Sequence, residues 1–263
     1  MAQESTELVV VEGLSLGYGA GQWVLTDVNM RVRSGEVWAI IGPNGAGKSS
    51  LLRALLGTMP TVRGGVSICG RSVEGLTVGE RARLVAHVSA RSIVSGMTVD
   101  QFVMLGRTPH RSLWTVGDTA ADRVMVRQAL EAVGMGKLGH RAFDELSQGQ
   151  GQLVRLARAM VQEPRLLLLD EPTANLDLGN TERMLGLMRH LAHSNGVGVV
   201  AVLHDITSAV NWADRVALVA NGGIARVWTN KGEVEDEVLS HAYGVTIRSV
   251  WAEDGTRCFY VGG

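Results

Sequence analysis

A glycine-rich segment between a buried strand and an amphipathic helix constrains this chain more than any other feature of its sequence. The apolar run Val37–Ile41 leads directly into GPNGAGKS, residues Gly42–Ser49, and leucines then recur at helical spacing until Gly57. This is the complete phosphate-binding-loop motif, in the strand–loop–helix setting that the motif requires. The sequence therefore predicts an α/β fold with a phosphate site at the end of a buried strand.

Each kind of residue in this loop is expected to make a different contact with a bound phosphate chain. Glycines let backbone N–H groups turn inward around the phosphates, and the helix that follows adds its positive N-terminal end. Lys48 supplies a point charge, and the Ser49 hydroxyl is a ligand for Mg²⁺. The other predicted contacts of the loop are Gly42, Asn44, Gly45, Gly47 and Ser50.

A pair of carboxylates ends a second strongly apolar strand. Leu166–Leu169 is a continuous apolar run, typical of a strand buried on both faces, and Asp170-Glu171 follow it. Two adjacent carboxylates at a strand end are also common on protein surfaces. Because a phosphate loop ends another buried strand, we favour a catalytic role: Asp170 holds Mg²⁺, and Glu171 orients or deprotonates the attacking water.

The segment LSQGQ, residues 146–150, predicts the start of an amphipathic helix. Ser147 and Gln150 have the spacing of a capping box, which satisfies backbone N–H groups at a helix start. A helix N-terminus that presents Ser147 and the Gly149 amide is also an anion site. The two interpretations are compatible, and we expect all three residues near a phosphate.

Hydrophobic patterning predicts one domain of 263 residues with an insertion. A helix around Thr181–His193, followed by the apolar run Val197–Leu203, makes a βαβ crossover, from which a parallel sheet follows. Residues from about 92 to 163 have helical patterns and little strand character. We expect an α/β core over about 6–91 and 164–250, with a helical subdomain over about 92–163.

Composition excludes some classes of function. Lys+Arg number 25 and Asp+Glu 26, a net charge of −1, whereas a dedicated nucleic-acid binder normally has a basic surplus. The longest apolar runs have about five residues, and a membrane-spanning helix needs about 20. Cys69 and Cys258 lie far apart in the sequence and have no metal-site spacing, which indicates reduced thiols. We expect no nucleic-acid partner.

The order and spacing of the motifs resemble the nucleotide-binding subunit of an ATP-binding-cassette (ABC) transporter over roughly residues 8 to 250. The motifs are GPNGAGKSS, LSQGQ, LLLLDEP, ANLD with Asp177, and the pair His204-Asp205. The resemblance implies ATP and Mg²⁺ as cofactors and ATP hydrolysis as the activity. It also implies a RecA-like P-loop NTPase core with an antiparallel β subdomain and an inserted α-helical signature subdomain.

The same resemblance implies roles that residue spacing alone leaves open. Tyr18 in LGYGAG occupies the place of an aromatic residue that stacks on adenine, and His204 that of a switch histidine that contacts the γ-phosphate. Asp177 resembles the acidic residue that links two subunits, although an ordinary helix cap is an alternative. The residues expected to carry catalysis are then Lys48, Glu171 and His204.

Two positions depart from the family pattern. Gln148 stands where the signature normally has glycine, which adds a side chain beside the nucleotide without removing the contacts of Ser147 and Gly149. Ser89 falls where the family has a glutamine, in the Q-loop, that reaches the Mg²⁺ and senses the membrane partner. Since a serine is too short for the same direct contact, we expect it to act on the metal through a water.

The resemblance also implies partners and a location. We expect a homodimer, or a pair of cassettes, around two ATP sites. The pair would bind transmembrane permease subunits peripherally, at the cytoplasmic face of the cell membrane, and serve a substrate-binding protein indirectly. The stretch Thr98–His110, with LGRTPH, resembles subunits that drive uptake of iron–siderophore, haem or cobalamin complexes.

Three alternatives remain open at this point. One is an importer or exporter subunit for another substrate. A second is an ABC ATPase that acts on DNA or the ribosome, which a single cassette without a heptad run does not favour. A third is a small-molecule kinase, which would share Gly42–Ser49 but has no use for LSQGQ.

Overall fold

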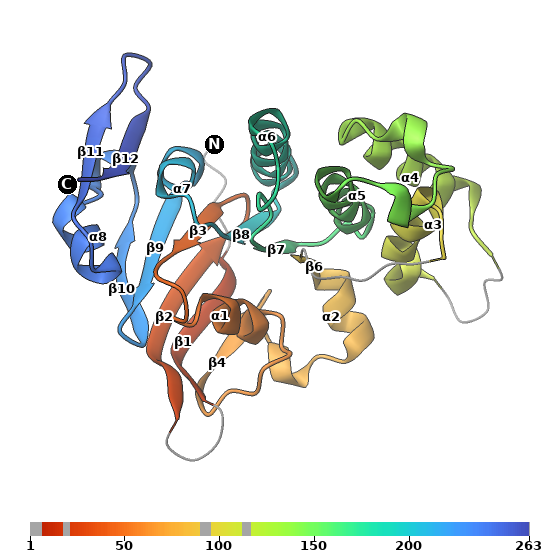
Figure 1. Cartoon of the computed structure of the whole chain (residues 1–263). Helices are drawn as coiled ribbons and strands as arrows, with labels where there is room; N and C mark the ends of the chain where they lie inside the picture. The colour runs from red at the N-terminus through yellow and green to blue at the C-terminus, as the bar shows by residue number, and fades with distance from the viewer. Residues whose placement is uncertain (1–6, 18–21, 90–95, 112–116, 263) are drawn as a thin grey trace, which may run out of the picture.

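Three sheets, the smallest of them a two-stranded hairpin, and the helices around them form the structure, a computed structural model that describes residues 7–17, 22–89, 96–111 and 117–262 (Figure 1). The largest sheet has six strands, and only β10 runs antiparallel to its neighbour. In spatial order the strands are β10 (Gly223–Trp228), β9 (Arg215–Ala220), β3 (Val37–Ile41), β8 (Gly198–Val202), β7 (Leu166–Asp170) and β6 (Val85–Ser89). The parallel strands bring the carboxyl ends of β3, β7 and β8 to one edge.

A second, antiparallel sheet is built mainly from the N-terminal part of the chain. Its order is β2 (Trp23–Arg33), β1 (Glu7–Gly17), β4 (Arg63–Ile68) and β5 (Arg71–Ser72). Along β2, exposed and buried residues largely alternate, because one face of the strand packs on the core.

The six-stranded sheet separates two hydrophobic cores. Helix α1 (Lys48–Leu55) and the antiparallel sheet pack on the face that carries Ile40 and Leu168. The opposite face carries Ala39 and Leu169. The helices that pack on it are α5 (Gln148–Val161), α6 (Leu178–Asn195) and α7 (Ile206–Trp212). The phosphate-loop helix and the helix that LSQGQ begins therefore lie on opposite faces of one sheet.

Helices form the stretch between β6 and β7 as far as the structure describes it. They are α3 (Val99–Met104), α4 (Ala120–Ala132), α5 and the 3₁₀ turns Leu105–His110, Gly136–Leu138 and Phe143–Glu145. Residues of α3, α4 and α5 share the core that α6 and α7 join. Figure 1 shows α3 and α4 projecting to one side of the six-stranded sheet. Helix α2 (Val78–Leu84) and the 3₁₀ turn Val73–Gly75 precede β6.

The C-terminal part of the chain forms a helix and a hairpin at the other side of the molecule (Figure 1). Helix α8 spans Asp236–Tyr243, and β11 (Ile247–Trp251) pairs with β12 (Arg257–Val261). Lys231–Glu233 form a 3₁₀ turn just before α8, because the Asn230 side chain accepts from the N–H groups of Gly232 and Glu233.

Candidate active site

The phosphate loop connects β3 to α1 in a shape that three glycines with positive φ, Gly42, Gly45 and Gly47, make possible. Gly42 has φ +144°, and a Cβ atom on it would lie 2.1 Å from the Val219 carbonyl oxygen. Gly47 precedes α1 with φ +101°. At Gly45 a Cβ atom would meet nothing within 4 Å, so this part of the loop is open to an incoming group. Substitution is therefore excluded by contact at Gly42 and strained at Gly47.

Lys48 is held by the loop that it belongs to. Its Nζ donates to the carbonyl oxygens of Gly42 (2.7 Å) and Pro43 (2.8 Å), and the residue is only 6% exposed. Burial lowers the pKa of Lys48 from its ordinary value, and the charges of Glu171 and Asp170 oppose that shift. The ammonium group is thus fixed beside the two carboxylates at the end of β7.

Ser49 and Asp170 meet, although they are far apart in the sequence. The Ser49 hydroxyl donates to Asp170 Oδ1 at 3.1 Å. A hydroxyl and a carboxylate are hard oxygen ligands, and Mg²⁺ in nucleotide sites takes few protein ligands because phosphates and waters complete its shell. Among the described residues no cluster of three His, Cys, Asp or Glu side chains suits a metal. The oxygen pair fits a nucleotide-bound Mg²⁺.

Glu171 and His204 form a second pair beside the first. His204 Nε2 lies 2.7 Å from Glu171 Oε1, and both side chains are nearly half exposed. Glu171 has φ +54°, a left-handed conformation that is rare outside glycine and that occurs in strained functional sites. Its N–H donates to the Val202 carbonyl, and Asp205 caps the start of α7. These contacts hold the carboxylate and the imidazole at the edge of the sheet, open to solvent.

Ser89 reaches the same region from β6. It is the register partner of Asp170 in the neighbouring strand. Ser89 also lines one cavity, of about 150 Å³, together with Ser49, Asp170 and Glu171. His87 also lines this cavity, and it belongs to none of the motifs that the sequence indicates. It lies on the same face of β6 as Ser89, because residues two apart in a strand point the same way. Burial lowers the pKa of His87.

The signature segment begins α5 as a capping box, as its spacing predicted. The Gln150 N–H donates to the Ser147 hydroxyl (3.2 Å), and the Ser147 N–H donates to the Gln150 side chain (3.1 Å). Ser147 and Gln148 are exposed. A Cβ atom on Gly149 would lie 3.2 Å from Leu176, so this segment packs on the loop that precedes α6.

Asp177 caps α6, which confirms the helix-cap interpretation. Its carboxylate accepts from the Asn180 N–H at 2.7 Å, and the residue is exposed. The phosphate-loop residues not yet placed differ in exposure, since Asn44 faces solvent and Ser50 is buried. Tyr18 lies outside the described residues, and its stacking on adenine stays a prediction.

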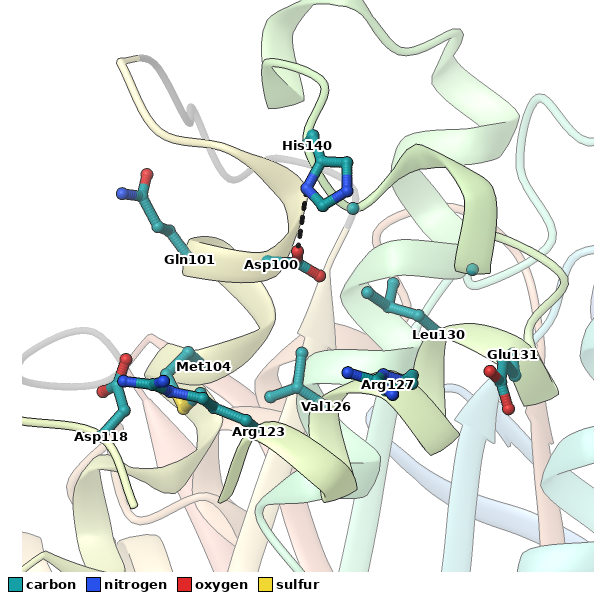
Figure 2. A pocket seen from close by; sticks show the side chains of 12 residues that line it. Asp100, Gln101, Met104, Asp118, Arg123, Val126, Arg127, Leu130, Glu131 and His140 are labelled. Atoms are coloured by element: carbon teal, nitrogen blue, oxygen red, sulfur yellow. Dashed lines mark ion pairs between the residues drawn. The ribbon is translucent and has the colours of Figure 1, made fainter. Parts of the chain in front are cut away.

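A larger cavity, of about 510 Å³, lies in the helical region away from these residues (Figure 2). Asp100, Gln101 and Met104 line it from α3, and Arg123 and Arg127 from α4. Figure 2 shows Asp100 and His140 facing each other, and their side chains form an ion pair at 3.7 Å. Its lining thus combines side chains of both charge signs with the apolar side chains of Met104, Val126 and Leu130.

Fold and site together define a P-loop nucleotide hydrolase, with a phosphate loop after β3 and carboxylates after β7 at one edge of a parallel sheet. The chain belongs to the ABC transporter family, because a family model of that description matches residues 25–174. That stretch contains the phosphate loop, the signature segment and Asp170-Glu171.

Relatives and solved structures agree with this assignment. Hemin import ATP-binding protein HmuV of Gloeobacter violaceus is 42% identical over 235 residues, 86% of this chain and 84% of that protein. An inward-facing structure of a metal-chelate type ABC transporter matches with a TM-score of 0.84 and 26% identity, over 98% of each chain. A dimeric post-hydrolysis structure of the cassette MJ0796, bound to ADP and phosphate, has a TM-score of 0.76 and 25% identity, over 84% of this chain and 98% of that one.

The family, the fold class and the ATPase activity predicted from the sequence are therefore confirmed. No helix among the described residues is both long enough and apolar enough to cross a membrane.

Proposed function

We propose that this chain hydrolyses Mg·ATP between its phosphate loop and the signature segment of a second cassette, and so drives a permease that imports haem or a related metal chelate. The observation that carries the hydrolytic part is the convergence of two pairs, Ser49 with Asp170 and Glu171 with His204, beside buried Lys48. The first pair and the lysine suit a metal-bound phosphate chain, and the second suits an attacking water.

The roles of these residues follow from their chemistry. Lys48 and the loop amides bind the phosphates. Ser49 and Asp170 would hold Mg²⁺, which when bound would neutralise charge on the phosphate oxygens. The Glu171 carboxylate accepts a proton from the water, or orients it, with His204 fixing the direction of the carboxylate through Oε1. Ser89, the register partner of Asp170, would act on the metal through a water.

Pairing of two cassettes is supported by the opposite placement of α1 and α5 on the sheet. The signature residues Ser147, Gly149 and Gln150 then serve the phosphates of a partner, not those of their own chain. Leu178 is 86% exposed beside exposed Asp177, as an apolar side chain buried only by a partner would be. A homodimer around two ATP sites satisfies both observations.

The permease contact is assigned to the helical subdomain, over about 92–163. The cavity of Figure 2 is lined by Asp100, Gln101 and Met104, which fall within Thr98–His110, the stretch that resembles uptake subunits. Haem or a metal chelate as cargo is supported by the hemin import relative and by the metal-chelate type structure. The chain then binds peripherally at the cytoplasmic face of the membrane, and a substrate-binding protein acts through the permease.

The test is transport in liposomes that contain this chain and the permease that co-purifies with it. Hemin uptake should require Mg·ATP enclosed in the liposomes, on the side of the membrane where this chain binds the permease, and the Glu171→Gln complex, which assembles normally, should not transport. ATP hydrolysis that no metal chelate stimulates, with no hemin or cobalamin accumulated, would contradict the assigned cargo. Failure of the chain to co-purify with any membrane protein would contradict the transport function itself.

A further inference from the structure

A tyrosine near the C-terminus contacts the first residue of the phosphate loop. The Gly42 N–H donates to the Tyr243 hydroxyl oxygen at 2.9 Å, although 201 residues separate the two. Tyr243 is the last residue of α8, outside the stretch that the family model matches. The contact therefore joins the C-terminal region to the loop that holds the phosphates.

Gly42 is held on both sides by contacts from outside its own position in the loop. Its N–H is held by Tyr243, and its carbonyl oxygen accepts from Lys48 Nζ at 2.7 Å. Its backbone packs so closely on Val219 that no other residue fits. The peptide groups on both sides of the Gly42 Cα are thus fixed, one by the C-terminal helix and one by the phosphate-binding lysine.

The helix that carries Tyr243 is itself firmly attached. The Ser249 N–H and hydroxyl both donate to the Asp236 carboxylate at 2.8 Å, which ties α8 to β11. Arg257 of β12 forms an ion pair with the same carboxylate at 3.0 Å and is 8% exposed. Because these contacts all converge on one carboxylate and are largely buried, α8 has little freedom to move relative to the hairpin.

The hairpin in turn is fixed to α7, the helix that follows His204. The Phe259 N–H donates to the Thr207 hydroxyl at 3.0 Å. The Asn211 side chain accepts from the Arg257 N–H (3.0 Å) and donates to the Arg257 carbonyl (2.8 Å). The C-terminal region, Asp236–Val261, therefore touches the active site at two points, the start of the phosphate loop and the helix behind the histidine.

We propose that Tyr243 is a positioning residue for ATP binding, which fixes Gly42 and through it the carbonyl that orients Lys48. The hydroxyl acts as a hydrogen-bond acceptor, and it touches neither the nucleotide nor the reacting atoms. Burial raises the pKa of Tyr243, so the phenol stays neutral at physiological pH. Without the hydroxyl, the Gly42 N–H loses its acceptor, and the loop samples conformations that hold the phosphates less well.

The experiment compares Tyr243→Phe with Tyr260→Phe in the full chain. Both changes remove one phenol oxygen, but Tyr260 is 47% exposed on β12, and its hydroxyl makes no hydrogen bond to the described residues of the loop. For Tyr243→Phe we expect ATP affinity to fall about three- to tenfold, the effect of one hydrogen bond, with kcat at saturating ATP within about twofold. Tyr260→Phe should leave both unchanged.

A second readout follows the contact without nucleotide. In ¹⁵N-glycine-labelled protein, the Gly42 amide proton should shift upfield and exchange faster in Tyr243→Phe, and not in Tyr260→Phe. An unchanged Gly42 signal would show that the contact does not form. A changed signal with wild-type ATP affinity would show that the contact forms but does not position the loop. Either result overturns the proposal, and neither bears on the transport function.

Discussion

The phosphate loop and the signature segment are both phosphate-binding elements at helix N-termini, but the structure treats them differently. Lys48 is 6% exposed and donates to two loop carbonyls, and Ser49 reaches Asp170 across the sheet. Ser147, in contrast, is exposed, and its hydroxyl accepts from the Gln150 N–H in the capping box of its own helix. The phosphate loop is thus held in place by contacts within its own chain. The signature segment is shaped as the start of a helix, and a phosphate that binds to it has to come from outside its own chain.

The largest expected effect separates ATP binding from ATP hydrolysis at the phosphate loop and the carboxylates beside it. Glu171→Gln should lower kcat about 10²–10⁴-fold, because a general base is lost, with ATP affinity changed little. Lys48→Ala should instead weaken ATP binding, because a fixed charge on the phosphates is gone. Steady-state hydrolysis and equilibrium binding of a fluorescent ATP analogue measure the two effects. Equal loss of affinity in both variants would contradict the assigned roles.

The next effect tests the exposed signature segment and its proposed contact with a second cassette. In the Glu171→Gln background, Mg·ATP should convert monomer to dimer, and Ser147→Arg should weaken dimerisation more than tenfold by placing bulk at the contact. Analytical ultracentrifugation with and without Mg·ATP measures the shift. Dimer formation that survives Ser147→Arg would mean that the signature segment is not at the interface.

A smaller change at the same residue needs a control for helix capping. Ser147→Ala and Thr119→Ala each remove the N-cap of a capping box, so each should cost about 1 kcal/mol of stability. Only Ser147→Ala should also slow ATP hydrolysis. If the two variants lose activity alike, the serine serves the helix and not the phosphate.

Ser89 should have a modest effect, because it acts through water. Ser89→Ala should cost about tenfold or less in hydrolysis, the worth of an ordinary hydrogen bond. Ser89→Gln should be tolerated or mildly activating in the isolated chain. ATPase assays with and without the permease measure both variants. A thousandfold loss in Ser89→Ala would reveal a direct catalytic role.

The smallest effect concerns the helical region that carries the signature segment. Hydrogen bonds from Arg107 and Thr119 lower the pKa of Asp122, whose side chain is 11% exposed. Its carboxylate therefore stabilises the fold above the ordinary pKa of an aspartate, about 4, and this contribution is lost as the pH falls through its lower native pKa. Asp122→Asn should lower the free energy of unfolding by about 1–2 kcal/mol at pH 7, and the difference should shrink toward pH 3.

Denaturant titrations at both pH values measure this difference. Asp118→Asn is the matched control, because its ion pair with Arg111 is more exposed and contributes less. A pH-independent effect of Asp122→Asn would mean that packing, not charge, holds this contact.

Local sequence patterns predicted the phosphate loop and its flanking strand and helix well. The apolar run Val37–Ile41 and the motif Gly42–Ser49 identify a strand, a loop and a helix start within about fifteen residues, where chain connectivity leaves few arrangements. The capping box of Ser147 is equally local and was predicted for the same reason. The pairing of Ser49 with Asp170 followed from parallel strands ending at one edge.

Contacts between distant segments could not be predicted in this way. Tyr243 ends an ordinary amphipathic helix, and nothing near it in the sequence indicates that its hydroxyl meets Gly42. His87 interrupts the apolar pattern of β6. A polar residue at that position indicates that the strand meets polar groups there, but it does not identify those groups. Both depend on how α8 and β6 lie against the core, and that is decided by tertiary packing.

The central claim, that each ATP site combines one chain's phosphate loop with the signature segment of another, is tested most directly by mixing two inactive variants. Lys48→Ala keeps a working signature segment, and Ser147→Arg keeps a working phosphate loop. In a mixed dimer, the loop of the second variant faces the signature segment of the first and forms one intact site. We predict that the mixture hydrolyses ATP well above the sum of the separate variants, with a maximum near equal amounts. A mixture no faster than that sum, together with a wild-type rate per molecule that is independent of protein concentration, would contradict the claim.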